Sequence, residues 1–178
     1  MSSPRAPRAP RLLLCLALGA ALLATPPVAL AREDPLQANK DLVRKFYRAM
    51  LTNDQETLPR LFAQGYQVEE VGAPPEANGL PRAQISPDFR VRAGHLHKAF
   101  TNLSLSISDL IAEGDQVVAR VTVTGVHRGE FMGVVATGRR VSLNAMVIFQ
   151  IKDGRITRTS ELLDMLGAMR QVGYIKLD

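Results

Sequence analysis

Cysteine and tryptophan are almost absent from this chain of 178 residues, which has one cysteine, Cys15, and no tryptophan. A lone cysteine cannot form an intramolecular disulfide, so a disulfide-stabilised scaffold is excluded. Histidine is also scarce, and His95 and His97 would point apart on a helix with no cysteine or acidic cluster beside them. We therefore expect no metal site, and a core stabilised by apolar burial alone.

The first 31 residues have the pattern of a secretory signal peptide. Three arginines precede an uninterrupted run of small and apolar residues at 12–24, and Ala-Leu-Ala follows at 29–31. We expect cleavage after Ala31, which leaves a secreted or periplasmic domain over residues 32–178. The apolar run is shorter than the ~20 residues of a membrane-spanning helix, so no stable membrane anchor is expected after cleavage.

Little net charge remains beyond that segment. The whole chain has 22 Lys and Arg against 17 Asp and Glu, a net charge of +5. The first 31 residues hold three of the basic residues and none of the acidic ones, which leaves 19 against 17 and a net +2. The rest of the sequence shows no basic stripe with interleaved aromatic residues, so nucleic-acid binding is not expected.

Helical periodicity comes first along the chain, and strand-like alternation follows it. Apolar residues at helical spacing predict a helix over residues 34–51, and weaker patterns predict helices over 54–62 and 89–100. Proline and glycine are frequent at 71–87, which predicts a loop, either a lid over a pocket or a plain surface crossover. Strands are predicted over 103–111, 116–127, 141–151 and 155–160, and a last helix over 162–172.

This order implies an α+β fold, with the N-terminal helices packed on the concave face of a curved antiparallel sheet. Successive side chains of a strand point to opposite faces. Val147 and Phe149 therefore share one apolar face, and His127 lies at the end of the matching face of the preceding strand. We expect these faces to line a pocket. Met146 and Ile148 make the opposite face partly apolar, explained either by dimerisation through the sheet or by scattered exposed side chains.

Five segments occur in an order and spacing that carry a family resemblance. They are NKDLVRKFY at 39–47, DLIAEGD at 109–115, GVHRGEFMG at 125–133, KDGRI at 152–156 and LLDMLG at 162–167. In these segments the chain resembles the SnoaL-like polyketide cyclases and ester cyclases of the nuclear transport factor two-like superfamily. The resemblance implies a cone-shaped fold with a deep pocket, a homodimer, and ring closure of a polyketide ester by intramolecular aldol condensation without cofactor or metal.

The resemblance also assigns an acid/base carboxylate to the position of Val147. Aldol closure needs a proton removed beside one carbonyl and a proton supplied to another, which a carboxylate in an apolar pocket can do and valine cannot. Two hypotheses therefore stay open. One is a protein that binds a small hydrophobic molecule in an apolar pocket but lacks the usual carboxylate. The other is an active cyclase- or isomerase-type enzyme that uses His127 and Glu161.

Three residues are candidates for the chemistry. His127 matches the family's histidine and could orient a ligand or move a proton, or it could hold the following loop as a structural residue. Glu161, expected at the start of the last helix, aligns with a family carboxylate and could replace the missing acid or favour the helix N-terminus. Asp164 matches the family as well, and its alternative role is in helix capping.

Four further residues are candidates for ligand contact. Tyr47 and Tyr66 could donate hydrogen bonds to a ligand, although packing with a satisfied hydroxyl is the default for a buried tyrosine. Val147 and Phe149 would form the apolar wall beside them.

Overall fold

A computed structural model describes residues 34–71 and 88–175 of the chain. The expected signal peptide and nearly all of the Pro- and Gly-rich segment lie outside these ranges. Helices α1 (Pro35–Thr52), α2 (Thr57–Arg60) and α3 (Phe89–Ala99) come first, and α4 (Met165–Val172) comes last. The strands are β1 (Phe62–Glu70), β2 (Phe100–Glu113), β3 (Gln116–His127), β4 (Arg140–Lys152) and β5 (Arg155–Leu163). No helix of the described residues is long and apolar enough to cross a membrane.

Helix α1 begins and ends at residues suited to those places. The Asp34 carboxylate accepts a hydrogen bond from the Leu36 amide at 3.0 Å, and Pro35 occupies the first turn. Asn53 ends the helix with a positive φ of 53°, which asparagine tolerates better than most residues. The apolar face predicted from the periodicity is confirmed, because Phe46 and Tyr47 are buried in the core.

Five strands form one sheet in the order β1-β5-β4-β3-β2. Strands β2 to β5 pair antiparallel with their neighbours, as predicted, but β1 pairs parallel with β5 through partners such as Phe62 and Ile156. The α+β class is confirmed, and the sheet is mixed. Residues 62–70 have no clear alternation of apolar and polar residues. They form a strand because they run alongside β5 and pair with its free edge.

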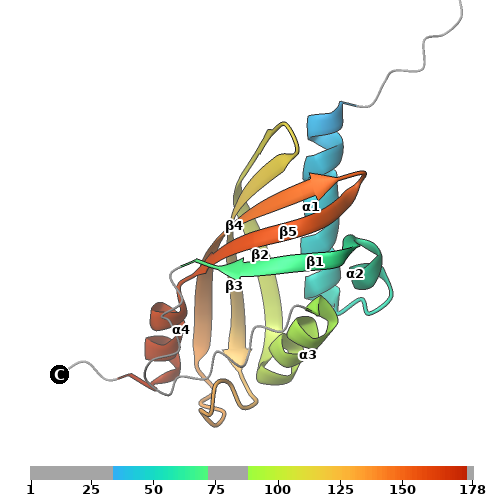
Figure 1. Ribbon diagram of the computed structural model, residues 1–178. Helices are drawn as coiled ribbons and strands as arrows, with labels where there is room; N and C mark the ends of the chain where they lie inside the picture. Colours follow the sequence, from blue (N-terminus) through green and yellow to red (C-terminus); the bar gives the residue numbers. More distant parts are fainter. Residues whose placement is uncertain (1–33, 72–87, 176–178) are drawn as a thin grey trace, which may run out of the picture. The chain divides into compact units, whose positions relative to one another are not determined.

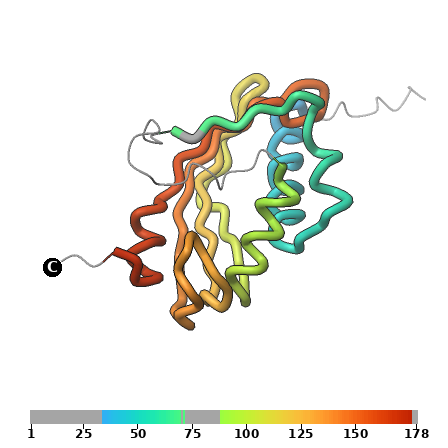
Figure 2. Tube along the Cα trace, turned by 60° about the horizontal axis from the view of Figure 1, so that its bottom comes forward, coloured from blue at the N-terminus to red at the C-terminus, as the bar shows by residue number. Residues whose placement is uncertain are grey.

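The helices sit at different places on the sheet. Helices α1 and α3 pack against β2, whereas α4 packs against β4 (Figure 1). Figure 2 shows the central strands between α4 on one side and α1 with α3 on the other. We call the sheet face that carries Val147 and Phe149 the inner face, and both side chains are buried there as parity predicted. Ile148 on the outer face is exposed.

Apolar side chains gather in two clusters of buried residues. The main core lies between α1, α3 and the middle of the sheet, and includes Val43, Phe46, Leu58, Phe89, Val117, Val121, Val147, Phe149 and Ile156. The second core lies where α4 meets the start of β4 and the start of β2, and consists of Ala99, Phe100, Val141, Ala168, Met169 and Val172. The main core contains the candidates Tyr47, Val147 and Phe149.

The end of β5 differs from the prediction. Residues 161 and 162 were expected to open the last helix, but they continue the strand and pair with Val147 and Met146 of β4. The helix starts only at Met165. Backbone pairing overrides the helix-favouring sequence here, because β4 on one side and β1 on the other both bond to this segment.

Candidate active site

A buried carboxylate lies on the inner face of β5. Glu161 is 3 % exposed and stands directly opposite Val147 in the β4–β5 ladder. Arg92 of α3 reaches it with both terminal nitrogens, at 2.9 Å from Nη1 to Oε1 and 2.5 Å from Nη2 to Oε2. The Thr159 hydroxyl donates to Oε1 at 2.9 Å. A buried charge is tolerated when it is paired and hydrogen-bonded in this way.

Two tyrosine hydroxyls extend this group, but they differ in their contacts. The Thr159 hydroxyl has one proton, which goes to Glu161, so the neighbouring Tyr66 hydroxyl donates to the Thr159 oxygen. The Tyr47 hydroxyl is buried and has no hydrogen-bond partner among the described residues. We call the five residues Tyr47, Tyr66, Arg92, Thr159 and Glu161 the polar cluster.

Both tyrosines remain neutral donors near neutral pH. Burial raises the pKa of Tyr47, and the nearby Glu161 charge raises it further against the opposing charge of Arg92. Burial likewise raises the pKa of Tyr66, although its hydrogen bond with Thr159 acts in the opposite direction. Tyr47 is buried and Tyr66 is half-buried, so both phenols lie in surroundings of low dielectric constant.

Aromatic rings surround the polar cluster. The Arg92 guanidinium carbon lies 4.4 Å from the centre of the Phe89 ring, and Phe89 stacks on Phe62 at 4.6 Å. Tyr47 packs edge-on against Phe149 at 5.8 Å. These rings give the polar groups an apolar surrounding, which strengthens the charge interactions among them.

Secondary structure explains why these side chains converge. Thr159 and Glu161 are two residues apart on β5, so they share the inner face. The Glu161 backbone is fixed from both sides, because it pairs with Val147 and its carbonyl accepts the Val71 amide at 2.8 Å. The site therefore rests on rigid elements.

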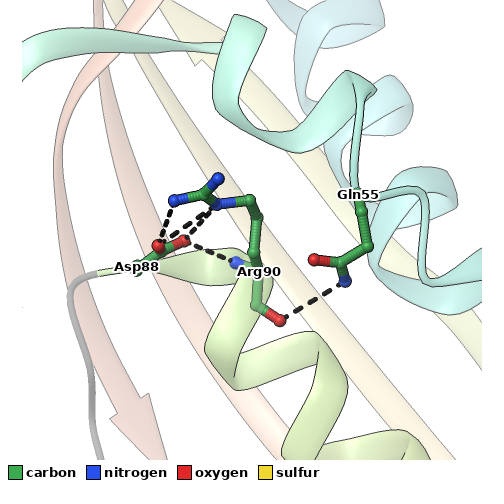
Figure 3. Close-up of polar contacts among 3 residues, drawn as sticks. All are labelled: Gln55, Asp88 and Arg90. Atoms are coloured by element: carbon green, nitrogen blue, oxygen red, sulfur yellow. Dashed lines mark hydrogen bonds and ion pairs between the residues drawn. The ribbon is translucent and has the colours of Figure 1, made fainter.

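The first turn of α3 is also held in place, which positions Arg92 one turn later. Asp88 caps the helix by accepting from the Arg90 amide at 2.9 Å, and its carboxylate also binds the Arg90 guanidinium (Figure 3). The Gln55 amide donates to the Arg90 carbonyl at 3.4 Å. These contacts lie in a surface depression next to α3, and no residue of the polar cluster lines it.

His127 lies away from the polar cluster, although the parity prediction placed it on the same face. Along β3 it is eight residues beyond Ala119, which lies in the same row as Val147 and Glu161. That separation is roughly 27 Å at the rise of a strand. The structure therefore does not bring His127 and Glu161 into one site.

The surroundings of His127 are those of a packed side chain. The ring is fully buried, lies 5.5 Å from the Phe100 ring and 6.3 Å from the Phe131 ring, and places Nδ1 3.0 Å from the Thr137 hydroxyl. Its Nε2 has no partner among the described residues. These contacts join the end of β3 and the start of β2 to the loop between β3 and β4.

Asp164 does not enter the site either. Its carboxylate accepts the Gly167 amide at 2.8 Å and caps α4 at the surface. Of the predicted residues, Tyr47, Tyr66, Val147, Phe149 and Glu161 come together. The sequence reasoning missed two members of the polar cluster, Arg92 and Thr159. Thr159 could have been found from its parity with Glu161, but no local pattern singled out Arg92.

Metal binding finds no support in this arrangement. Within residues 34–71 and 88–175, no group of three or more His, Cys, Asp or Glu side chains is placed to hold a metal ion. The polar cluster offers one carboxylate, an arginine and three hydroxyls. These groups suit hydrogen bonding and proton transfer at an organic ligand.

Solved structures define the class of fold. The chain superposes on AclR from Streptomyces galilaeus with a TM-score of 0.66 and 25 % identity, over 79 % of this chain and 99 % of that one. It superposes on TsrD from Streptomyces laurentii with a TM-score of 0.66 and 28 % identity, over 81 % and 100 %. The fold is that of the nuclear transport factor two-like superfamily.

Sequence comparison identifies the family within that class. The SnoaL-like polyketide cyclase family matches residues 40–172, so the chain belongs to this family. It is 38 % identical over 60 residues to the aklanonic acid methyl ester cyclases DnrD of Streptomyces peucetius and DauD of Streptomyces sp. strain C5. The aligned part covers 34 % of this chain and only 41 % and 37 % of these two curated relatives.

Proposed function

We propose that this protein is a cofactor-independent enzyme of the cyclase or isomerase type, with Glu161 as its acid/base group. The observation that carries the proposal is the buried carboxylate opposite Val147. Facing residues in neighbouring strands have Cβ atoms about 5 Å apart. A carboxylate on β5 therefore serves the same part of the inner face as one on β4 at position 147.

The arrangement around Glu161 suits proton transfer. A carboxylate has about four lone-pair positions. Oε1 accepts from Arg92 and Thr159, whereas Oε2 accepts only from Arg92. One position on Oε2 remains to take a proton from the carbon beside a substrate carbonyl, and the protonated acid then returns it at another carbon. Arg92 orients the carboxylate through its two hydrogen bonds.

The walls of the cluster indicate the kind of substrate. Phe62, Phe89 and Phe149 present apolar ring surface beside Val147, and the polar groups gather at one end. A small and mostly hydrophobic carbonyl compound matches this distribution, with its ring or chain against the aromatic side chains and its reacting carbon near Glu161.

Exchange of carbon-bound protons tests the proposal. We expect the wild-type protein to accelerate deuterium exchange of 2-tetralone, a bicyclic ketone, in D₂O. Glu161→Gln keeps the shape of the side chain but cannot take up the proton, so exchange should fall by about 10²–10⁴-fold. NMR signal loss at the carbon beside the carbonyl measures the rate. Exchange at the wild-type rate in Glu161→Gln would refute the role of Glu161.

A second candidate function is ligand binding without turnover. The bidentate pair with Arg92 favours it, because both carboxylate oxygens already accept hydrogen bonds and are less available to a substrate. The same assay separates the two functions. A protein that binds 2-tetralone in a thermal-shift titration, yet leaves its exchange rate at the buffer value, is a binding protein.

Export and dimerisation complete the proposal. The signal-peptide pattern at residues 1–31 supports export to the periplasm or beyond. Mass spectrometry of the mature protein would test it, because the expected mass is that of a chain that begins at Arg32.

Exposed apolar residues on the outer sheet face support a homodimer through that face. They are Met146, Ile148 and Leu162, with exposed fractions of 46 %, 41 % and 52 %.

A further inference from the structure

We infer that the Tyr47 hydroxyl binds the carbonyl oxygen of the substrate, so that the site selects a ketone or ester over a hydrocarbon of the same shape. This inference rests on the proposed function and adds a second substrate-contacting residue to Glu161. It also defines the chemistry that the ligand must have: a hydrogen-bond acceptor at the polar end of an otherwise apolar body.

The starting observation is a buried donor that the fold leaves without a partner. Among the described residues, only the Tyr47 hydroxyl and His127 Nε2 are buried side-chain polar atoms that make no hydrogen bond. A buried hydroxyl without a partner destabilises a folded protein. Phenylalanine would fill the same space without that cost. The hydroxyl of Tyr47 therefore does nothing for the fold of the described residues and is free to bind a ligand.

Neighbouring contacts show where this donor lies. Tyr47 is on α1, with its ring 5.0 Å from Phe46 and 5.8 Å from Phe149, which fixes its orientation. Phe149 faces Thr159 in the β4–β5 ladder, and Glu161 lies two residues further along on the same face, so the phenol lies in the neighbourhood of the buried carboxylate. Burial keeps the phenol protonated, and a protonated phenol donates.

Tyr66 and His127 do not meet the same conditions. The Tyr66 hydroxyl is already bonded to Thr159, so it is part of the support for Glu161. His127 Nε2 is unpaired but lies beside Phe100 in the second core, far along β3 from the carboxylate. Tyr47 alone among the described residues combines an unpaired donor with the neighbourhood of Glu161.

The chemistry of proton removal gives this donor a role in the reaction. When Glu161 takes the proton, the electrons of the C–H bond form a carbon–carbon double bond, and the carbonyl π electrons move to the oxygen. The oxygen becomes an enolate, and a hydrogen bond from Tyr47 is stronger to this anion than to the neutral ketone. Tyr47 thus stabilises the charge that develops, while Glu161 holds the proton that was removed.

Stability of the ligand-free protein provides the first test. Tyr47→Phe should leave the melting temperature unchanged or raise it, because it removes an unpaired buried hydroxyl. Tyr66→Phe is the matched comparison and should lower the melting temperature, because it breaks the chain to Thr159 and Glu161. If Tyr47→Phe lowers the melting temperature as much as Tyr66→Phe, the hydroxyl has a partner in the fold and the inference fails.

Ligand discrimination provides the second test. The probes are 2-tetralone and 2-methylenetetralin, a hydrocarbon of the same shape with a CH₂ group in place of the carbonyl oxygen. Wild type should bind the ketone at least tenfold more tightly, Tyr47→Phe should bind the two within twofold, and the exposed Tyr174→Phe should match wild type. The inference is overturned if wild type binds the two probes equally or binds neither of them. It is also overturned if Tyr47→Phe still prefers the ketone. If Glu161→Gln loses deuterium exchange while Tyr47→Phe keeps the preference for the ketone, the inference about Tyr47 fails but the proposed function of Glu161 is retained.

Discussion

At Glu161 and Val147, two neighbouring strands place a carboxylate opposite an apolar side chain on the same buried face. The pair shows that an acid can be supplied to one region of the inner face from either strand, because facing side chains of a ladder occupy adjoining space. The absence of an acid at position 147 therefore does not remove acid/base chemistry from this site. Arg92 and Thr159 then determine how the carboxylate at 161 is oriented.

The role of His127 can be tested by its removal. The ring is fully buried between Phe100 and Phe131, so His127→Ala should lower the free energy of unfolding by about 2–4 kcal/mol through the cavity it leaves. Thr137→Ala, which removes the hydroxyl that contacts His127 Nδ1 and the Arg139 amide, should cost about 1 kcal/mol. Urea titration measures both. Proton exchange of 2-tetralone by the folded fraction should stay within threefold of wild type, and a tenfold loss in folded His127→Ala would bring His127 back into the site.

At the scale of elements, the start of α4 illustrates how a motif that matches the family can be structural. A Cβ added to Gly167 would lie 2.3 Å from the Asp164 carboxylate oxygen. Glycine is required there because the cap folds back over the first turn of the helix. In the LLDMLG segment at 162–167, the two leucines end β5, Asp164 caps α4, and Gly167 leaves room for the cap. The segment contains no residue of the polar cluster.

Asp164 should therefore affect stability and not activity. Asp164→Ala removes the acceptor for the Gly167 amide and should lower the free energy of unfolding by about 1 kcal/mol, whereas Asp164→Asn keeps an acceptor and should lose less. Urea denaturation followed by circular dichroism provides the comparison. Exchange of 2-tetralone should be the same in both variants and in wild type, so a large loss in Asp164→Asn would contradict the capping role.

Strand β1 is the element that local pattern predicts least well. Its sequence, FAQGYQVEE, mixes polar residues with a glycine at a positive φ of 77°, and it pairs with β5 with an irregular register. Such a segment becomes a strand because the β5 edge offers unpaired backbone groups. The consequence for the site is direct, because β1 carries Tyr66 toward Thr159.

At the scale of the whole molecule, the outer face of the sheet is the surface through which we expect the protein to assemble. Met146 and Leu162 pair across the β4–β5 ladder beside Ile148, so three exposed apolar side chains are neighbours. We predict that wild type has twice the mass of the chain in size-exclusion chromatography with light scattering. Ile148→Lys should give the mass of one chain, because it places a charge in the buried interface.

The matched control for this prediction is Val135→Lys. Val135 is 76 % exposed and lies on the loop between β3 and β4, away from the outer face. This variant should keep the wild-type mass. A wild type that has the mass of one chain at micromolar concentration would contradict dimerisation through the sheet.

The sequence by itself determined the order of the helices and of strands β2 to β5, the inner face of β4 and the apolar face of α1. These features follow from periods of two and 3.6 residues, which are local properties of the chain. Only the tertiary structure decided that Glu161 belongs to a strand, that Arg92 meets it from 69 residues away, and that His127 lies elsewhere. Such contacts depend on how distant segments pair and pack, and no local pattern encodes them.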